Sequence, residues 1–251
     1  MNRINMRCMS IIAAFAAAAL SCHTSVVSAA EGQAVAAAPA SSPVVAKILK
    51  ANASVKNIES KFTQVKTIKA SGRKIASEGT LYFTPDGHLT MRYSKPAGEL
   101  LVVNGNKFHM NKGGKAMPFD TSKNALMGSL ANTLVNCIKG DPETVAAANN
   151  AKLAVSETAE GYVVTLTASA AGHRGYSKIV LTYRKSDCVL VKMIMEETVG
   201  ITNTYEMKEV KKNTSLPSDA FRIPTKKNPW HPQKLYLREA DTFAESFLLQ
   251  P

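Results

Sequence analysis

Residues 78–96 read EGTLYFTPDGHLTMRYSKP, and this stretch decides the class of fold. Apolar residues stand at every second position on both sides of Pro85-Asp86-Gly87; they are Leu81, Phe83, Leu89, Met91 and Tyr93. A period of two predicts strands with one buried face, and Pro-Asp-Gly predicts a tight turn between them. We therefore expect a β-hairpin whose apolar face packs against the rest of the protein.

The same alternation continues through most of the chain after residue 57. Glycines recur every seven to eleven residues from Gly79 to Gly113, and Asn104-Gly105 predicts a second hairpin turn. The more polar segment 202–210 is expected at an edge of the sheet. The spacing predicts a meander of roughly ten antiparallel strands; its other alternating segments are residues 108–110, 153–155, 162–166, 179–183 and 189–195.

Two segments have the period of a helix instead. Residues 43–56 form one amphipathic stripe, and Ser42 and Pro43 are suitable residues to begin it. A second stripe lies between about residues 121 and 138, where apolar side chains recur every four positions at Leu126, Leu130, Leu134 and Ile138. Thr121 or Ser122 is the expected cap of this second helix, and Gly140-Asp141-Pro142 is expected to stop the chain after it.

The order of these elements predicts a mainly β protein with α-helices. One helix precedes the strands and another interrupts them, so we expect an open, incomplete antiparallel β-barrel, a half-barrel, covered by helices. We assign this domain to residues 43–224, with a flexible leader at residues 30–42 and a tail of unassigned structure at residues 225–251.

Residues 1–29 have the pattern of a secretory signal peptide. Arg3 and Arg7 precede an apolar run at residues 9–20, which is shorter than the ~20 residues that span a bilayer as a helix. We expect cleavage after Val27-Ser28-Ala29 and export to the periplasm. Because Cys22 follows a weak lipobox sequence, its acylation is the alternative.

The chain is basic, with a formal net charge of +12. Its lysines are scattered rather than clustered, which favours solubility and attraction to anionic lipid or acidic partners over a nucleic-acid site.

Two cysteines follow the signal peptide, Cys137 and Cys188. In an oxidising compartment such a pair indicates either one disulfide or two separate buried thiols, and we take the disulfide as the prediction to test. No metal site is predicted, because His88, His109, His173 and His231 have no ligand spacing.

Catalytic motifs are missing from the sequence. It contains no Gly-x-Ser-x-Gly, no His-Glu-x-x-His and no glycine-rich phosphate loop. Acidic residues such as Glu99, Glu196 and Glu197 are expected on the solvated surface. The sequence thus predicts a binding protein without catalytic residues or cofactor, while a hydrolase of envelope lipids is the competing hypothesis, since catalytic triads form in space rather than in sequence.

Five short segments, in this order, resemble the LolA-type outer-membrane lipoprotein carriers. They are NIESKFTQ at residues 57–64, EGTLYFTP at 78–85, MRYSKP at 91–96, VVNGN at 102–106 and LPSDAFRIP at 216–224. Many members carry an arginine, thought to latch a lid, before the first strand-ending proline, where this chain has Thr84. Arg92 is the candidate to replace it.

The resemblance implies a monomeric periplasmic chaperone that sequesters the acyl chains of lipoproteins. It would receive them from an inner-membrane lipoprotein-releasing complex and deliver them to an outer-membrane acceptor, without cofactor or nucleic acid. The alternative is a lipid-binding sensor, or an anchored lipid-binding lipoprotein, of the same fold.

An acyl carrier needs an apolar cavity, because exposing an acyl chain to water costs about 0.8 kcal/mol per CH₂. The second helix could form a movable roof, and methionines could adapt to mobile chains. The same residues would also be buried if they only formed the folding core. The candidate lipid-binding residues are Leu81, Phe83, Leu89, Met91, Tyr93, Phe108, Met110, Leu126, Met127, Leu130, Leu134, Met193 and Met195.

Overall fold

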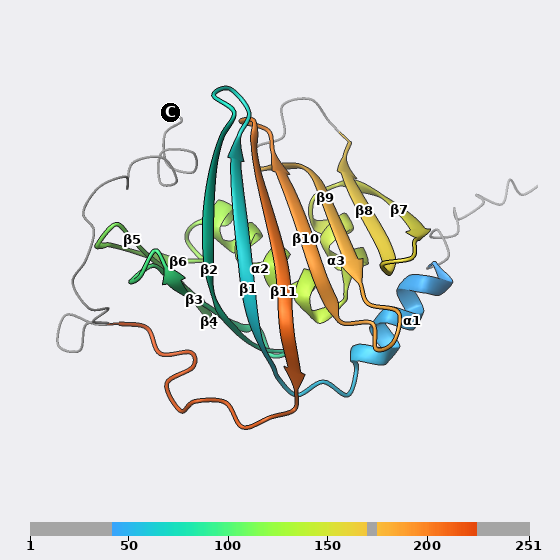
Figure 1. Ribbon diagram of the computed structural model, residues 1–251, viewed down its shortest axis with the longest axis horizontal. Coiled ribbons are helices and arrows are strands. Elements are labelled where there is room, and N and C mark those ends of the chain that lie inside the picture. The colour runs from blue at the N-terminus through green and yellow to red at the C-terminus, as the bar shows by residue number, and fades with distance from the viewer. Residues whose placement is uncertain (1–41, 170–174, 225–251) are drawn as a thin grey trace, which may run out of the picture. The chain divides into compact units, whose positions relative to one another are not determined.

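The computed structural model describes residues 42–169 and 175–224 (Figure 1). The predicted signal peptide, the leader up to residue 41 and the tail after residue 224 lie outside the described residues. Cys22, whose acylation is the alternative to cleavage after Ala29, also lies outside them.

Within residues 42–169 and 175–224, eleven strands form one antiparallel sheet in the order β6-β5-β4-β3-β2-β1-β11-β10-β9-β8-β7. The sheet does not close, and β6 and β7 are its two edges. The prediction of a mainly β, open half-barrel is confirmed. The strands are β1 (Ile58–Ile68), β2 (Arg73–Thr84), β3 (His88–Lys95), β4 (Leu100–Asn104), β5 (Lys107–Lys112), β6 (Lys115–Asp120), β7 (Ala151–Glu157), β8 (Tyr162–Ala168), β9 (Tyr176–Tyr183), β10 (Leu190–Glu197) and β11 (Ile201–Lys212).

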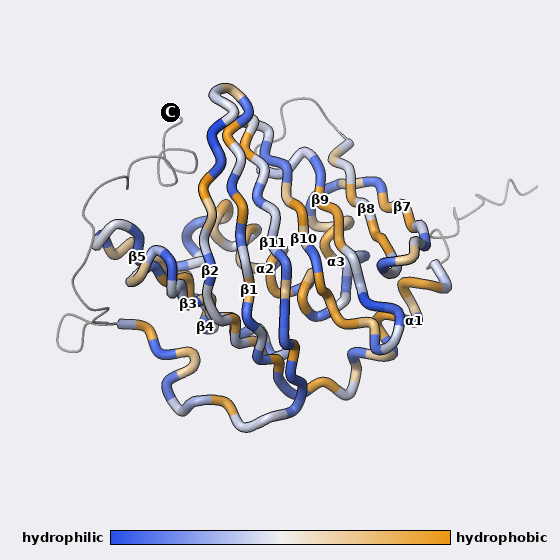
Figure 2. The backbone as a smooth tube through the Cα atoms, in the orientation of Figure 1, coloured by the Kyte–Doolittle hydropathy of each residue, from blue (hydrophilic) through white to orange (hydrophobic). Residues whose placement is uncertain are grey.

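The last strand, β11, lies in the middle of the sheet and not at its edge. It pairs with β1 on one side and with β10 on the other. Figure 2 shows that β11 is largely hydrophilic, but its inward residues Ile201 and Tyr205 are buried. The prediction of an edge strand is wrong, because any antiparallel strand with one solvated face is half polar wherever it lies.

The helices of the central connection join the two edges of the sheet. After β6 the chain forms α2 (Ala125–Lys139) and α3 (Pro142–Ala148) and then reaches β7 at the opposite edge. Both helices lie on one face of the sheet, behind it in Figure 1. We call this face the inner face. It is covered by the connection between the sheet's own edge strands.

The first helix after β6 begins and ends at defined caps. Asn124, rather than Thr121 or Ser122, caps α2, and its side-chain oxygen accepts from the Met127 backbone N–H at 3.1 Å. At the other end Gly140 has a φ of 84°, a conformation that favours glycine.

The expected stop after Gly140 is in fact the start of another helix. The Asp141 side chain accepts from the Thr144 backbone N–H at 3.1 Å, and Pro142 is the first residue of α3. The prediction of a stop is wrong, because aspartate before proline is a favourable helix start.

The N-terminal helix, α1 (Pro43–Asn52), begins where predicted and ends earlier than residue 56. Ile48 is fully buried, and the Asn52 side-chain amide donates to the Cys188 carbonyl at 2.8 Å. This bond ties α1 to the loop before β10.

Cys137 and Cys188 are both buried free thiols, so the predicted disulfide is not formed. Cys137 faces the core from α2, and burial raises the pKa of its thiol to about 12. Cys188 holds a turn, with a φ of 55° and its backbone N–H donating to the Arg184 carbonyl at 2.8 Å. Each cysteine therefore has its own structural role.

Candidate functional site

The inner face of the sheet and α2 enclose one apolar cluster. Alternation along each strand turns one side chain in two toward α2, which accounts for the membership of the cluster. Eleven of the thirteen candidate lining residues belong to it: Leu81, Phe83, Leu89, Met91, Phe108, Met110, Met127, Leu130, Leu134, Met193 and Met195.

The other two candidates lie differently. Tyr93 is half-buried at the margin of the cluster, where its ring meets the Phe62 ring edge to face at 5.1 Å. Leu126 is 38% exposed and does not face the sheet. The buried stripe of α2 begins at Met127 instead.

The two halves of α2 are held by different forces. In the C-terminal half, the Tyr183 hydroxyl donates to the Cys137 carbonyl at 2.9 Å, and the Asn149 amide donates to the Thr133 hydroxyl at 3.3 Å. In the N-terminal half, Met127 and Leu130 make apolar contacts, and no side-chain hydrogen bond to the sheet is found within residues 42–169 and 175–224.

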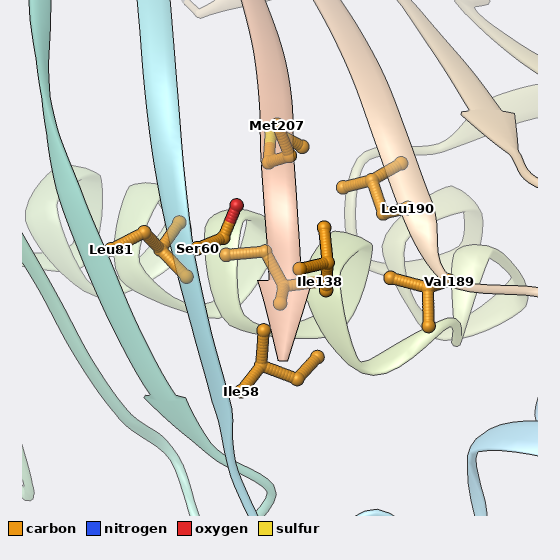
Figure 3. A pocket seen from close by; sticks show the side chains of 8 residues that line it. Ile58, Ser60, Leu81, Ile138, Val189, Leu190 and Met207 are labelled. Atoms are coloured by element: carbon orange, nitrogen blue, oxygen red, sulfur yellow. The ribbon is translucent and has the colours of Figure 1, made fainter. Parts of the chain in front are cut away.

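One small apolar pocket lies beneath the C-terminal end of α2 (Figure 3). Its open space is about 10 Å³, which is about the volume of one water-sized sphere. Pockets that hold small-molecule ligands have roughly 300–1,000 Å³. Its lining residues are Ile58, Ser60, Leu81, Ile138, Val189, Leu190, Met207 and Val210.

Of the candidate residues, only Leu81 lines this pocket. Ile138 was part of the predicted helical stripe, but Met207 was missed because its strand was assigned to an edge. The sequence pattern that could have revealed Met207 is the alternation of apolar inward residues at Ile201, Tyr205 and Met207. Val210 shares their face because Glu209, with a φ of 51°, lies at a bulge in the β1–β11 pairing.

The family assignment follows from comparison with known proteins. Residues 53–224 match the family described as outer membrane lipoprotein carrier protein LolA. The chain belongs to this LolA family. No curated protein sequence matches it.

Three solved structures are among those similar to this LolA-family chain. An uncharacterized conserved protein of Thermus thermophilus is 11% identical, covering 74% of this chain and 95% of its own, with a TM-score of 0.43. A LolA superfamily protein of Nitrosomonas europaea is 12% identical, covering 71% and 97%, with a TM-score of 0.37. The lipoprotein LppX of Mycobacterium tuberculosis is 13% identical, covering 71% and 100%, with a TM-score of 0.38.

Arg92 does not replace the arginine latch of the LolA family. It alternates with Met91 and Tyr93, which face inward, so it lies on the outer face. There its guanidinium binds the Asp219 carboxylate at 3.3 Å and also the Asp219 carbonyl. The closing family segment, residues 216–224, is thereby fastened to the outside of the sheet.

A second bond fastens the same segment. The Asn104 amide donates to the Phe221 carbonyl at 3.1 Å, and the Phe221 ring lies 5.4 Å from the His88 ring. Figure 1 shows this segment running from the end of β11 toward β3 and β4.

Toward the N-terminus of β11 the inner face becomes polar. We call five buried residues there the polar end: Gln64 and Lys66 of β1, Glu197 of β10, and Asn203 and Tyr205 of β11. The Gln64 amide donates to the Asn203 carbonyl oxygen at 2.9 Å and to the Tyr205 hydroxyl at 3.2 Å. Asn203 in turn donates to Glu197 at 2.8 Å.

Burial shifts the charged groups of the polar end toward neutrality. It raises the pKa of Glu197 to about 7, although Lys66 and the Asn203 bond oppose this shift. It also lowers the pKa of Lys66 to about 8, assisted by the charge of Lys112. The prediction that Glu197 lies on the solvated surface is wrong, since the residue is only 7% exposed.

Two further features of the described residues bear on the site. In residues 42–169 and 175–224, no helix is long and apolar enough to cross a membrane. The same residues contain no group of three His, Cys, Asp or Glu side chains that could hold a metal ion.

Proposed function

We propose that this protein is a periplasmic carrier that sequesters the acyl chains of lipoproteins between α2 and the inner face of its sheet. It takes lipoproteins from an inner-membrane releasing complex and delivers them to an acceptor at the outer membrane, and it works by binding rather than catalysis. Membership of the LolA family, matched over residues 53–224, is the observation that carries this proposal.

The composition of the inner face supports it. A ~16-carbon chain costs on the order of 12 kcal/mol to expose to water, so its carrier needs a continuous apolar surface. The cluster under α2 offers such a surface, and Met91, Met127, Met193 and Met195 are among its members. Methionine's flexible thioether adapts to chains that have no fixed shape.

In this proposal the structure is the closed form of the carrier. The space of about 10 Å³ under α2 is far too small for an acyl chain, so binding requires α2 to move away from the sheet. Its N-terminal half is the part that moves, because among the described residues Met127 and Leu130 join it to the sheet through apolar side-chain contacts. Acyl chains then replace these contacts with similar ones.

The experiment places a charge in the roof. Leu130→Asp should lower the affinity for a diacylated peptide by at least roughly 100-fold, because an unpaired carboxylate would enter the dry site. Leu130 is 6% exposed, whereas Leu126 on the same helix is 38% exposed, so Leu126→Asp is the matched control and should bind as the wild type does.

Circular dichroism and thermal melting show whether each variant is folded. A folded Leu130→Asp protein that binds the diacylated peptide with wild-type affinity would show that α2 is not the roof. Mass spectrometry of lipid co-purified from native periplasm tests the ligand class independently, and acylated peptide is the expected species.

A further inference from the structure

The polar end is unusual because it places amide, ammonium and carboxylate groups on a face that is mostly apolar. Along β1 every second residue faces inward: Ile58 and Phe62 are buried and apolar, Ser60 is buried between them, and Gln64 and Lys66 continue the alternation. Lys66 is 4% exposed and Gln64 is 6% exposed. These polar side chains therefore lie inside the half-barrel and not on its solvated face.

Stability does not account for these residues. Burying charged groups costs several kcal/mol per ion, and well-packed apolar residues of the same size are often as stable or more so. Half-buried Glu99 and Lys112 both act electrostatically on Lys66, with one charge of each sign. With Glu197, the group contains two lysines and two glutamates, so it has no net preference for an anion.

The polar end presents both donors and acceptors. The Tyr205 hydroxyl accepts from Gln64, and its own proton has no acceptor among residues 42–169 and 175–224. Lys66 is a second donor, and the Glu197 carboxylate can accept more than the one bond it receives from Asn203. A neutral amide beside an acyl chain needs this combination, a donor for its C=O and an acceptor for its N–H.

We propose that the polar end is a headgroup subsite, which binds the uncharged amide and ester groups next to the acyl chains of the ligand. This inference rests on the proposed carrier function. The site would favour an acylated cysteinyl peptide over a phospholipid with the same chains, because a phosphate would meet Glu197 and Glu99 without a surplus of positive charge.

The test uses the full-length mature protein and two probes with palmitoyl chains, a triacylated cysteinyl peptide and phosphatidylglycerol. The wild type should bind the peptide more tightly. Lys66→Met/Glu197→Gln should lose roughly 10-fold in affinity for the peptide and keep its affinity for phosphatidylglycerol. Tyr205→Phe, which removes only a hydroxyl, should lose several-fold for the peptide alone.

The matched control lies on the outer face of neighbouring strands. Lys192 of β10 and Glu206 of β11 form a half-exposed ion pair at 3.4 Å, and Lys192→Met/Glu206→Gln should leave both affinities unchanged. If folded Lys66→Met/Glu197→Gln and Tyr205→Phe proteins bind the peptide like the wild type, or weaken for both probes equally, the headgroup subsite is overturned and the carrier function stands. A wild type that binds neither probe would overturn both.

Discussion

The inner face of the sheet is held in two different ways. Met127 and Leu130, in the first turns of α2, make apolar contacts that have no fixed direction. At the polar end, and at the Tyr183–Cys137 contact, directional hydrogen bonds hold the side chains. Apolar contacts can be exchanged for those of an acyl chain at little cost, whereas a buried hydrogen bond must be replaced by another.

Under the proposed carrier function, this difference would divide the molecule into a part that opens and a part that stays in place. Gln64 shows the second kind clearly, because its two amide protons and its carbonyl oxygen all have side-chain partners. A carrier needs both parts, one to admit chains of variable shape and one to keep the sheet in register while it does so.

The largest expected effect lies at the boundary between the two parts. Gly79 is buried between Phe62 and the backbone of Arg92, and an added Cβ would overlap the Arg92 carbonyl oxygen and lie 2.9 Å from the Phe62 ring. Because backbone cannot move aside cheaply, Gly79→Val should lower the free energy of unfolding by about 3 kcal/mol or more, measured by urea denaturation.

The control is Ala76→Val on the exposed part of the same strand, which should change the free energy of unfolding by less than about 0.5 kcal/mol. Equal effects of the two substitutions would mean that the strands at this boundary are not packed as described.

The second prediction concerns Glu197, the acid at the polar end. Lys66 is the ionisable group that opposes the rise of its pKa, and the charge of Glu197 in turn raises the pKa of Tyr176 and Tyr205. Because the Glu197 pKa is raised from 4.5 to about 7, the folded protein keeps a proton that the unfolded chain releases. The stability contributed by this group therefore falls as the pH rises from about 4.5 to about 7.

Glu197→Gln removes this titration and keeps the acceptor for Asn203. The variant should gain stability over the wild type across that window, reaching about 3 kcal/mol above pH 7, as measured by denaturation at several pH values. Glu206→Gln on the outer face should change stability by less than about 1 kcal/mol. A Glu197→Gln protein that is less stable than the wild type at pH 8 would contradict the burial of this charge.

The third prediction tests how strongly hydrogen bonds hold the polar end. The Tyr93 hydroxyl donates to the Gln64 carbonyl oxygen at 2.9 Å, so Tyr93→Phe leaves a buried acceptor without this donor and should cost about 1–2 kcal/mol of unfolding free energy. Tyr162→Phe should cost less than this, because the Tyr162 hydroxyl is bonded to exposed Lys47, which water can replace. The reverse order would count against the polar end as a tightly held network.

Sequence reasoning found the strands and the apolar lining because both follow from local periodicity. Strand partners are not local, so nothing in residues 202–210 showed that β11 pairs with β1. Leu126 was misplaced for a geometric reason. A helix turns ~100° per residue, so each four-residue step drifts by ~40°, and Leu126 lies ~120° around the helix from Ile138.

The polar end was missed for the opposite reason. Gln64 and Glu197 are single polar residues within alternating strands, and a polar residue in a strand is ordinarily interpreted as solvent-facing. Only the register shows that Gln64 lies opposite Tyr205 and that Lys66 lies opposite Asn203. The LolA resemblance, carried by collinear motifs, was confirmed by the family match over residues 53–224.

The smallest expected effect tests where α2 stays attached. The Tyr183 hydroxyl donates to the Cys137 carbonyl at 2.9 Å, and both residues are fully buried. Tyr183→Phe should cost about 1 kcal/mol of unfolding free energy, because the Cys137 carbonyl still receives the Gly140 N–H at 3.4 Å.

Hydrogen exchange is the sharper measurement. In the wild type the amides near Leu130 should exchange faster than those near Cys137, since apolar side-chain contacts join the first turns to the sheet. Tyr183→Phe should speed exchange near Cys137 and reduce that difference. Uniform exchange along α2 in the wild type would mean that the helix moves as one rigid body, and the distinction between an opening half and an anchored half would then be wrong.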